Sequence, residues 1–525
     1  MEPVLGLDQS QPSIDAPLGS TPRSENFIMR EGALEVRRGL AARGTNANSM
    51  RTTVTGGWEI NDVFGNRYPL ISGTSRLAWF SNGSWSAASY VSAYGLNDPP
   101  AGSATSYWDA TQTYAVDRDD MIAVLANGSY QSLYCWQSNT TIFSTLTGAP
   151  QAKFVMAFDN YVLAANVRSG SSEYVQRIMW NDRGSSSSWT GGLAGFEDLL
   201  SMRGAITRLT DLDNRIIVFS DQEIWQGYPS AFPNVFRFEQ LDHTVGCPYS
   251  WTVADTPLGL IFLARNLQTY LLPKGGGPPR PIGQRLHREI RNSIDIPERA
   301  WSLYDSALDQ FQLYYPHLGG SGFPQRAVFL NLADGSWAPQ TFAPVTGNIS
   351  LTRGFAVTGL ALTSSATTWG GLSNASLRWA DLTQSWAQMN AGTTSQDARL
   401  VFVGTSAGTM TYPDSTATND LGVTFPARWR STGLWGEIPD RTKTVTEWRA
   451  DYQAESSSSL TVRFSQTLGA GFDPGVSVGM QPASIVSQAL AFPYLNARYP
   501  LFEVESEGQK YRLFRFYVSA RIGGQ

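Results

Sequence analysis

Short apolar runs separated by Asp, Asn and Gly recur along most of this chain. One run covers residues 154–158 and is followed by Asp159, Asn160 and a second run at 161–165. Runs of this length bounded by turn residues are typical of buried strands, and the Asn-Gly pairs at 82–83 and 127–128 indicate tight hairpins. The pattern therefore predicts a chain built mainly from antiparallel β-hairpins.

These hairpins form a loose internal repeat, in which two apolar strands joined by an Asp/Asn/Gly turn precede an aromatic strand. Successive copies begin near Lys153, Ile206, Trp251, Trp301, Gly354 and Leu400, and two weaker copies surround residues 68–85 and 114–128. Four short strands in about 40–50 residues are typical of one blade of a β-propeller. We expect an all-β fold with a propeller of about seven blades, within a range of six to eight. A series of ordinary β-sandwiches with accidental spacing is the alternative.

The two ends of the chain follow other patterns. Residues 1–50 are polar with scattered prolines, which predicts an extended N-terminal arm. Near the C-terminus, residues 444–450, 460–464 and 511–518 alternate with period two, which indicates strands with one wet face.

The predicted domains are therefore an arm at 1–50, a β-propeller at 51–427 and a C-terminal antiparallel β-sandwich at 428–525. Helix is scarce, and the best candidate is the segment 284–293.

Composition narrows the class of protein. The 525 residues include 63 aromatic residues but only 16% charged residues, with a net charge of −5. This excludes a coiled coil and a disordered chain, and the acidic balance argues against sequence-independent DNA binding. The two cysteines, Cys135 and Cys247, are expected to be small buried hydrophobes rather than a disulfide framework. No secretory signal is visible at the N-terminus and no apolar run is long enough for a membrane helix, so we expect no membrane insertion.

Motifs that carry chemistry are scarce. The three histidines, His243, His287 and His317, show no metal-ligand spacing, and there is no Gly-x-Ser-x-Gly elbow, Walker loop or Gly-x-Gly-x-x-Gly motif. The acidic segments 117–120 and 211–214 sit between strands, where turn geometry explains them better than a calcium site or a glycosidase carboxylate pair. A Ser–His–Asp triad could still assemble from residues distant in sequence. We therefore predict no enzyme, and no catalytic, cofactor-binding or metal-binding residues.

An ordered series of weak motifs resembles the virion proteins of tailed bacteriophages. The matching segments are 5–8 to Asn26, 30–39, 178–182 with Trp189, 204–209, 215–224, 236–238 through 245–247, and 434–439 with Lys443. Asn181 stands where these proteins carry Ser. Each motif alone is weak, but their order is more specific. The resemblance is to the tail nozzle, also called tail tubular protein B, and to packaged-DNA stabilisation proteins.

The resemblance implies a structural tail protein that forms or closes the DNA-ejection channel as a homo-oligomeric ring of about six copies. It implies neighbours such as an adaptor or tail-tube protein and tail fibres, with DNA only as cargo. It also implies assembly in the host cytoplasm and a final place in the virion. Two alternatives stay open: a receptor-binding or baseplate propeller module of a phage tail, and a carbohydrate-active propeller enzyme.

Overall fold

The computed structural model describes residues 5–10, 16–17, 19–42, 53–74, 76–81, 84–92, 95–96, 103, 106–137, 142–230, 234–342, 350–358, 399–414, 416–433, 441–466 and 471–522. Nearly all of its regular structure is β-strand, as the apolar hairpin pattern predicts. The motif at 434–439 lies outside the described residues. Among the described residues, no helix is long and apolar enough to span a membrane.

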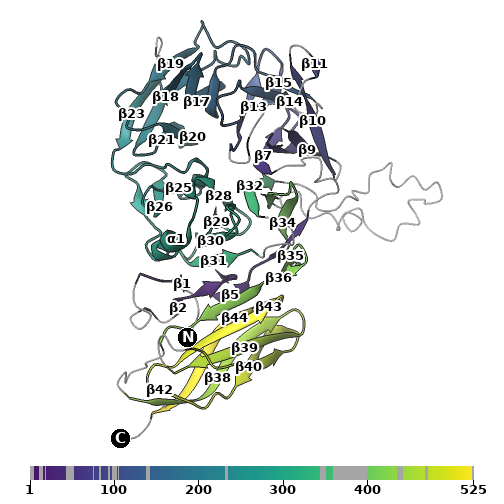
Figure 1. Cartoon of the computed structure of the whole chain (residues 1–525), viewed down its shortest axis with the longest axis vertical. Coiled ribbons are helices and arrows are strands. Elements are labelled where there is room, and N and C mark those ends of the chain that lie inside the picture. The colour runs from purple at the N-terminus through teal and green to yellow at the C-terminus, as the bar shows by residue number, and fades with distance from the viewer. Residues whose placement is uncertain are drawn as a thin grey trace, which may run out of the picture.

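Antiparallel four-stranded units follow one another through the first two thirds of the chain (Figure 1). The first contains β7 (Val54–Asn61), β8 (Arg67–Gly73), β9 (Leu77–Ser81) and β10 (Ser84–Ser92), with the short β11 (Gly95–Leu96) on β10. The second contains β12 (Asp109–Ala115), β13 (Asp120–Ala126), β14 (Tyr134–Gln137) and β15 (Ile142–Thr145). Strands β10 and β15 pair in parallel, so the first two units form one continuous sheet.

Four separate four-stranded sheets come next. They are β16 (Gln151–Phe158), β17 (Tyr161–Ser169), β18 (Ser172–Trp180) and β19 (Gly195–Asp198); β20 (Ile206–Leu212), β21 (Arg215–Ser220), β22 (Ile224–Pro229) and β23 (Phe236–Asp242); β24 (Ala254–Thr256), β25 (Gly259–Leu263), β26 (Thr269–Pro273) and β27 (Arg280–Pro281); and β28 (Trp301–Asp305), β29 (Gln310–Tyr315), β30 (Arg326–Asn331) and β31 (Trp337–Thr341). Their starts at 151, 206, 254 and 301 agree with the repeat. The α-helix α1 (His287–Ser293) lies inside the predicted helical segment. The structure also has two short 3-10 helices, η2 (Ser250–Thr252) and η3 (Pro297–Arg299).

The repeat copies near Gly354 and Leu400 are not separate sheets, so that part of the repeat was wrong. Strand β32 (Leu351–Thr358) pairs with β33 (Arg399–Thr405), and both belong to one sheet with β34 (Met410–Asp414). The fourth strand is β6 (Gly39–Ala42) from the N-terminal segment, which pairs with β34 on one side and with β35 (Asn419–Asp420) on the other. Strand β35 in turn pairs with β36 (Val423–Thr424). The repeat misleads here because both copies contribute strands, β32 and β33, to the same sheet.

The first strands of successive units lie next to one another around a circle. Strand β7 contacts β12, β12 contacts β16, β16 contacts β20, and β20 contacts η2, which directly precedes β24. Strand β24 contacts β28, β28 contacts β32, and β32 contacts β7. The circle is therefore closed, and an apolar cluster at its centre includes Tyr107, Trp251, Trp301, Leu303 and Val403. This arrangement is an all-β propeller.

Two further sheets lie below the propeller in Figure 1 and share one apolar core. One contains β3 (Ser24–Glu25), β37 (Pro426–Arg430), β43 (Leu501–Glu507), β39 (Ser458–Ser465) and β40 (Val476–Met480). The other contains β4 (Phe27–Arg30), β5 (Ala33–Val36), β44 (Tyr511–Ile522), β38 (Lys443–Ala454) and β41 (Ala483–Ala491), with β42 (Leu495–Ala497) on β38. The alternating runs near the C-terminus therefore form strands, as predicted.

The N-terminal segment contributes strands to both parts of the molecule. Strands β1 (Gly6–Leu7) and β2 (Ser20–Thr21) pair with each other, β3 and β5 complete the C-terminal sheets, and β6 belongs to the propeller. A polar, proline-containing segment looks like an arm by composition, because its strands are short and their partners lie near the other end of the chain. Both cysteines are buried and unpaired, which confirms that they act as small hydrophobes.

Candidate functional site

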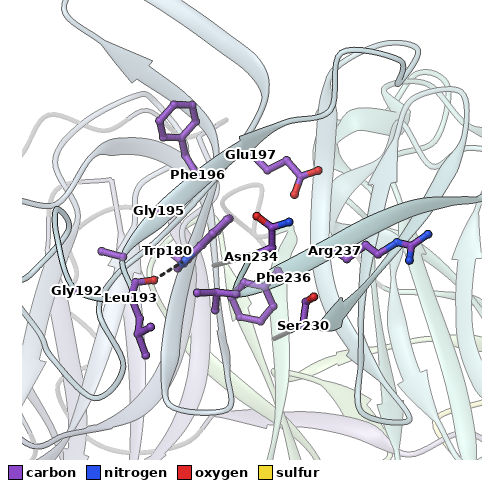
Figure 2. Close-up of a pocket in the computed structure, with 12 residues that line it drawn as sticks. Trp180, Gly192, Leu193, Gly195, Phe196, Glu197, Ser230, Asn234, Phe236 and Arg237 are labelled. Carbon is purple, nitrogen blue, oxygen red and sulfur yellow. Dashed lines mark hydrogen bonds between the residues drawn. The ribbon is translucent and has the colours of Figure 1, made fainter. Parts of the chain in front are cut away.

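A pocket of about 410 Å³ lies where the outer strands of two neighbouring propeller sheets meet (Figure 2). We call it the rim pocket. Its walls come from the end of β18, from β19 and the residues before it, and from the connection between β22 and β23. The residues that line it are Trp180, Gly192, Leu193, Ala194, Gly195, Phe196, Glu197, Ser230, Asn234, Val235, Phe236 and Arg237.

Two buried aromatic side chains hold the floor of the rim pocket in place. Trp180 donates from Nε1 to the Leu193 carbonyl over 2.9 Å, which ties the end of β18 to the residues just before β19. The Phe236 ring meets the Trp180 ring edge-to-face, with centroids 5.2 Å apart and planes at 84°. A Cβ at Gly195 would lie 2.9 Å from the Trp180 ring, so the absence of a side chain there lets the backbone lie against the indole.

The mouth of the rim pocket is polar. Glu197 is partly buried, and this burial raises the pKa of its carboxyl above the ordinary value. Figure 2 shows Phe196 pointing away from the other labelled side chains, and Phe196 is exposed. The Arg177 guanidinium lies 4.3 Å from the Phe196 ring centroid and pairs with Asp198 over 2.6 Å. An aromatic floor and a mixed polar mouth can bind a ligand that presents both an apolar face and hydrogen-bonding groups.

Few ionisable side chains line the rim pocket. Its lining contains one carboxylate, Glu197, and one guanidinium, Arg237, and it contains neither histidine nor cysteine. Glycoside hydrolysis ordinarily needs two carboxyl groups across the scissile bond. Among the described residues, no group of three His, Cys, Asp or Glu side chains is placed to hold a metal ion.

The acidic segments from the sequence serve as turn and loop anchors. Asp117 accepts hydrogen bonds from the backbone and side chain of Ser186; burial alone would raise its pKa, but these bonds lower it overall. Asp213 accepts from the Gly275 amide over 2.5 Å. None of the three histidines lines the rim pocket: His243 lines a separate loop cavity, His287 begins α1, and the backbone of His317 forms a β-bridge with Ile294.

The sequence patterns predicted no residue of the rim pocket as a functional site, although two of its aromatic residues stand in recognisable motifs. Trp180 and Phe236 each stand in a motif that resembles phage virion proteins, where they look like blade-packing aromatics. The fold brings these two motifs together, more than fifty residues apart in sequence, at one pocket. Motif position alone did not reveal the pocket, because the pocket depends on how β19 and β23 meet.

The fold defines a class: an all-β propeller protein with a small pocket at its rim and an attached β-rich C-terminal region. No protein-family model and no curated protein matches the chain. Solved structures with a similar fold include BamB from Moraxella catarrhalis, 10% identical, covering 75% of this chain and 94% of that chain with a TM-score of 0.36.

Two further structures are similar at the same level. YCF48 bound to D1 peptide is 9% identical, covering 72% of this chain and 97% of that chain, with a TM-score of 0.37. The exo-β-1,3-galactanase from Phanerochaete chrysosporium is 10% identical, covering 92% of this chain and 100% of that chain, with a TM-score of 0.28. Similarity at this level does not assign an activity.

Proposed function

We propose that the protein is a structural subunit of a bacteriophage tail, the nozzle ring that forms or closes the DNA-ejection channel. The order of the virion-protein motifs along the chain suggests this role. The observation that carries it is the way in which residues 20–42 join the propeller to the C-terminal sheets. A subunit that transmits force along a tail needs its parts fixed to one another.

Asn26 lies at the centre of this junction. Its side chain accepts hydrogen bonds from Thr341 N over 2.8 Å and from Arg37 Nε over 2.9 Å, and it donates to the Pro426 carbonyl over 2.6 Å. Its φ of 60° is one that Asn adopts more readily than most residues. One side chain thus connects the last strand of a propeller sheet, the N-terminal segment and the first strand of the C-terminal part.

Further bonds support the same junction. Gln340 donates to the Phe27 carbonyl over 3.0 Å, Asn331 donates to the Met29 carbonyl over 3.2 Å, and the Thr21 hydroxyl is 2.7 Å from the Arg430 carbonyl. Because these bonds are buried or partly buried, water competes weakly for them. The two parts of the chain are expected to move as one body.

The proposal includes the number of blades, the arrangement of the C-terminal sheets and the number of copies in the ring. We count seven blades, with the parallel-paired first two units as two blades and with β6 completing the last. The C-terminal sheets would form an antiparallel sandwich that borrows β3, β4 and β5. In the assembled tail, about six copies would form the ring, beside an adaptor or tail-tube protein and tail fibres. The mildly acidic net charge of −5 suits a conduit that must let DNA pass.

The oligomeric state tests this proposal. Purified full-length chain is examined by negative-stain imaging and native mass spectrometry, and virions of a phage that encodes it are probed with an antibody against it. Closed rings and antibody label at the tail tip are expected. A strict monomer that is missing from purified virions would refute the proposal.

The rim pocket favours a second candidate, a receptor-binding or baseplate propeller module. Its aromatic floor and polar mouth match the way proteins bind sugars and other amphipathic ligands. Glycan-array binding that is lost in a Trp180→Ala variant with an intact fold would favour this candidate. A carbohydrate-active enzyme would instead turn over chromogenic glycosides, and that turnover would fall in Glu197→Gln.

A further inference from the structure

Side chains from well-separated strands meet at the centre of the propeller. The guanidinium carbons of Arg208 on β20 and Arg353 on β32 lie 5.0 and 4.4 Å from the centroid of the Trp251 ring. The Tyr107 ring, just before β12, lies 5.9 Å from the same ring, edge-to-face. Strands β20 and β32 have other neighbours around the circle, so these side chains meet only across its centre. Together with Asp109, they form what we call the central cluster.

The charges of the central cluster do not balance. Arg208 pairs with Asp109 over 2.6 Å, and the second Asp109 oxygen accepts the Val155 amide over 3.0 Å. Asp109 is fully buried, and each of its oxygens already has a strong partner. Among the described residues, no carboxylate lies within ion-pair distance of Arg353. The central cluster therefore contains two guanidinium groups and one carboxylate, and that carboxylate pairs with Arg208 alone.

Donors in the same place lack acceptors. Nε and Nη1 of Arg353 and the hydroxyl of Tyr107 are all buried without a hydrogen-bond partner. Burial, aided by the nearby Arg208 charge, lowers the pKa of Arg353 to about 9, and burial raises the pKa of Tyr107 to about 12. At neutral pH, Arg353 is therefore a cation and Tyr107 a neutral donor. The Arg353 residue as a whole is half-buried, although Nε and Nη1 of its guanidinium are buried.

We propose that the central cluster binds a small oxyanion, a carboxylate or a phosphate, against Arg353 and Tyr107. A buried cation without a counter-ion is costly, and unpaired buried donors add to that cost. A water molecule could accept from the donors, but it would leave the charge uncompensated. The Trp251 ring holds the Arg353 guanidinium by a cation–π contact, so the donors are positioned before the ion arrives. The site does not depend on the proposed tail function.

Thermal unfolding of the full-length protein tests this site. The midpoint is followed in low-salt buffer while sodium phosphate, sodium acetate or sodium chloride is added at matched ionic strength. A ligand that binds only the folded state raises the midpoint with its concentration. We expect phosphate or acetate to raise the midpoint of the wild-type protein by several degrees more than chloride does, and the stronger of the two identifies the ion class.

Variants locate the effect. Arg353→Met should abolish the oxyanion-specific shift, and Tyr107→Phe, which removes one donor but keeps the ring, should reduce it several-fold. Arg183→Gln, at an exposed ion pair, is the matched control and should respond as the wild type does. If neither ion raises the wild-type midpoint above chloride, the site does not exist. If Arg353→Met and Tyr107→Phe both keep the full shift, the ion binds elsewhere and the proposal is wrong.

Discussion

The pair formed by Arg37 and Asp420 offers the sharpest test of how the chain is held together. Both side chains are 2% exposed, and Arg37 Nη2 and Nη1 reach the two Asp420 oxygens over 2.5 and 2.8 Å. The remaining donors reach Asn26 Oδ1 and the carbonyls of Arg38 and Thr341, each over 2.9 Å. All five guanidinium donors are used, and the group lies 3.7 Å from the Phe425 ring centroid. Arg37→Met removes all of these bonds at once.

The expected cost follows from what the substitution leaves behind. The Asp420 carboxylate would stay buried without the Arg37 guanidinium, and breaking a buried ion pair in this way costs about 3–5 kcal/mol. The exposed pair of Arg183 and Asp159, whose side chains are 51% and 49% exposed, provides the control. Arg183→Met should cost at most about 1 kcal/mol. The double variant Arg37→Met with Asp420→Asn should recover part of the loss, because no buried charge remains.

Urea unfolding followed by tryptophan fluorescence measures these differences. A chain with two folded parts can unfold in more than one step, so the variants are compared at the midpoint of each transition. Arg37 touches both parts, so we expect Arg37→Met to lower every midpoint. A shift no larger than that of Arg183→Met would refute the view that this pair fixes the junction.

Three further predictions use single residues as probes. Burial raises the pKa of the Cys135 thiol to about 11 and that of the Cys247 thiol to about 12. Both thiols should therefore react with a disulfide reagent only after the protein unfolds. Rapid labelling of the native protein would contradict their burial. Because burial raises the pKa of the Glu197 carboxyl, the stability that this group contributes is present at acid pH and is lost as the pH rises through the pKa of the folded state. Glu197→Gln should therefore melt at the same temperature as the wild type near pH 4 and at a higher temperature near pH 7. A difference in melting temperature that stays constant across that range would contradict the prediction. Gly195→Ala places a Cβ 2.9 Å from the Trp180 ring and should lower the free energy of unfolding by about 1–3 kcal/mol. Gly479→Ala is the control, because no atom lies within 4 Å of the added Cβ, and it should leave the melting temperature nearly unchanged.

Local sequence patterns predicted the strands and turns whose partners lie close to them in the sequence. The apolar runs around Asp159 and Asn160 form β16 and β17, with both turn residues at positive φ, as a tight hairpin requires. The alternating run at 511–518 lies within β44. In these segments the strand, its partner and the turn that joins them are close in sequence, so the pattern contains most of the information.

Pairings between segments that are far apart in the sequence could not be predicted, because local patterns contain no information about distant partners. The four residues of β6 carry no pattern that points to β34, about 370 residues later, and the pair of Arg37 and Asp420 has no sequence signature at all. The rim pocket and the central cluster likewise depend on which sheets become neighbours. The periodicity predicted that aromatic residues pack between strands, but it could not show that Trp251 would contact two arginines.

The position of β6 links closure of the propeller to completion of the C-terminal sheets. Strand β6 follows β5 after two residues, and β5 pairs with β44 at the other end of the chain. The last propeller sheet therefore gains its fourth strand from a segment that is anchored in the C-terminal sheets, and the Arg37–Asp420 pair lies between the two. Because such long-range pairings form late in folding, the ring and the C-terminal part are expected to gain their final stability together. A chain built in this way would not present a closed propeller without its C-terminal sheets.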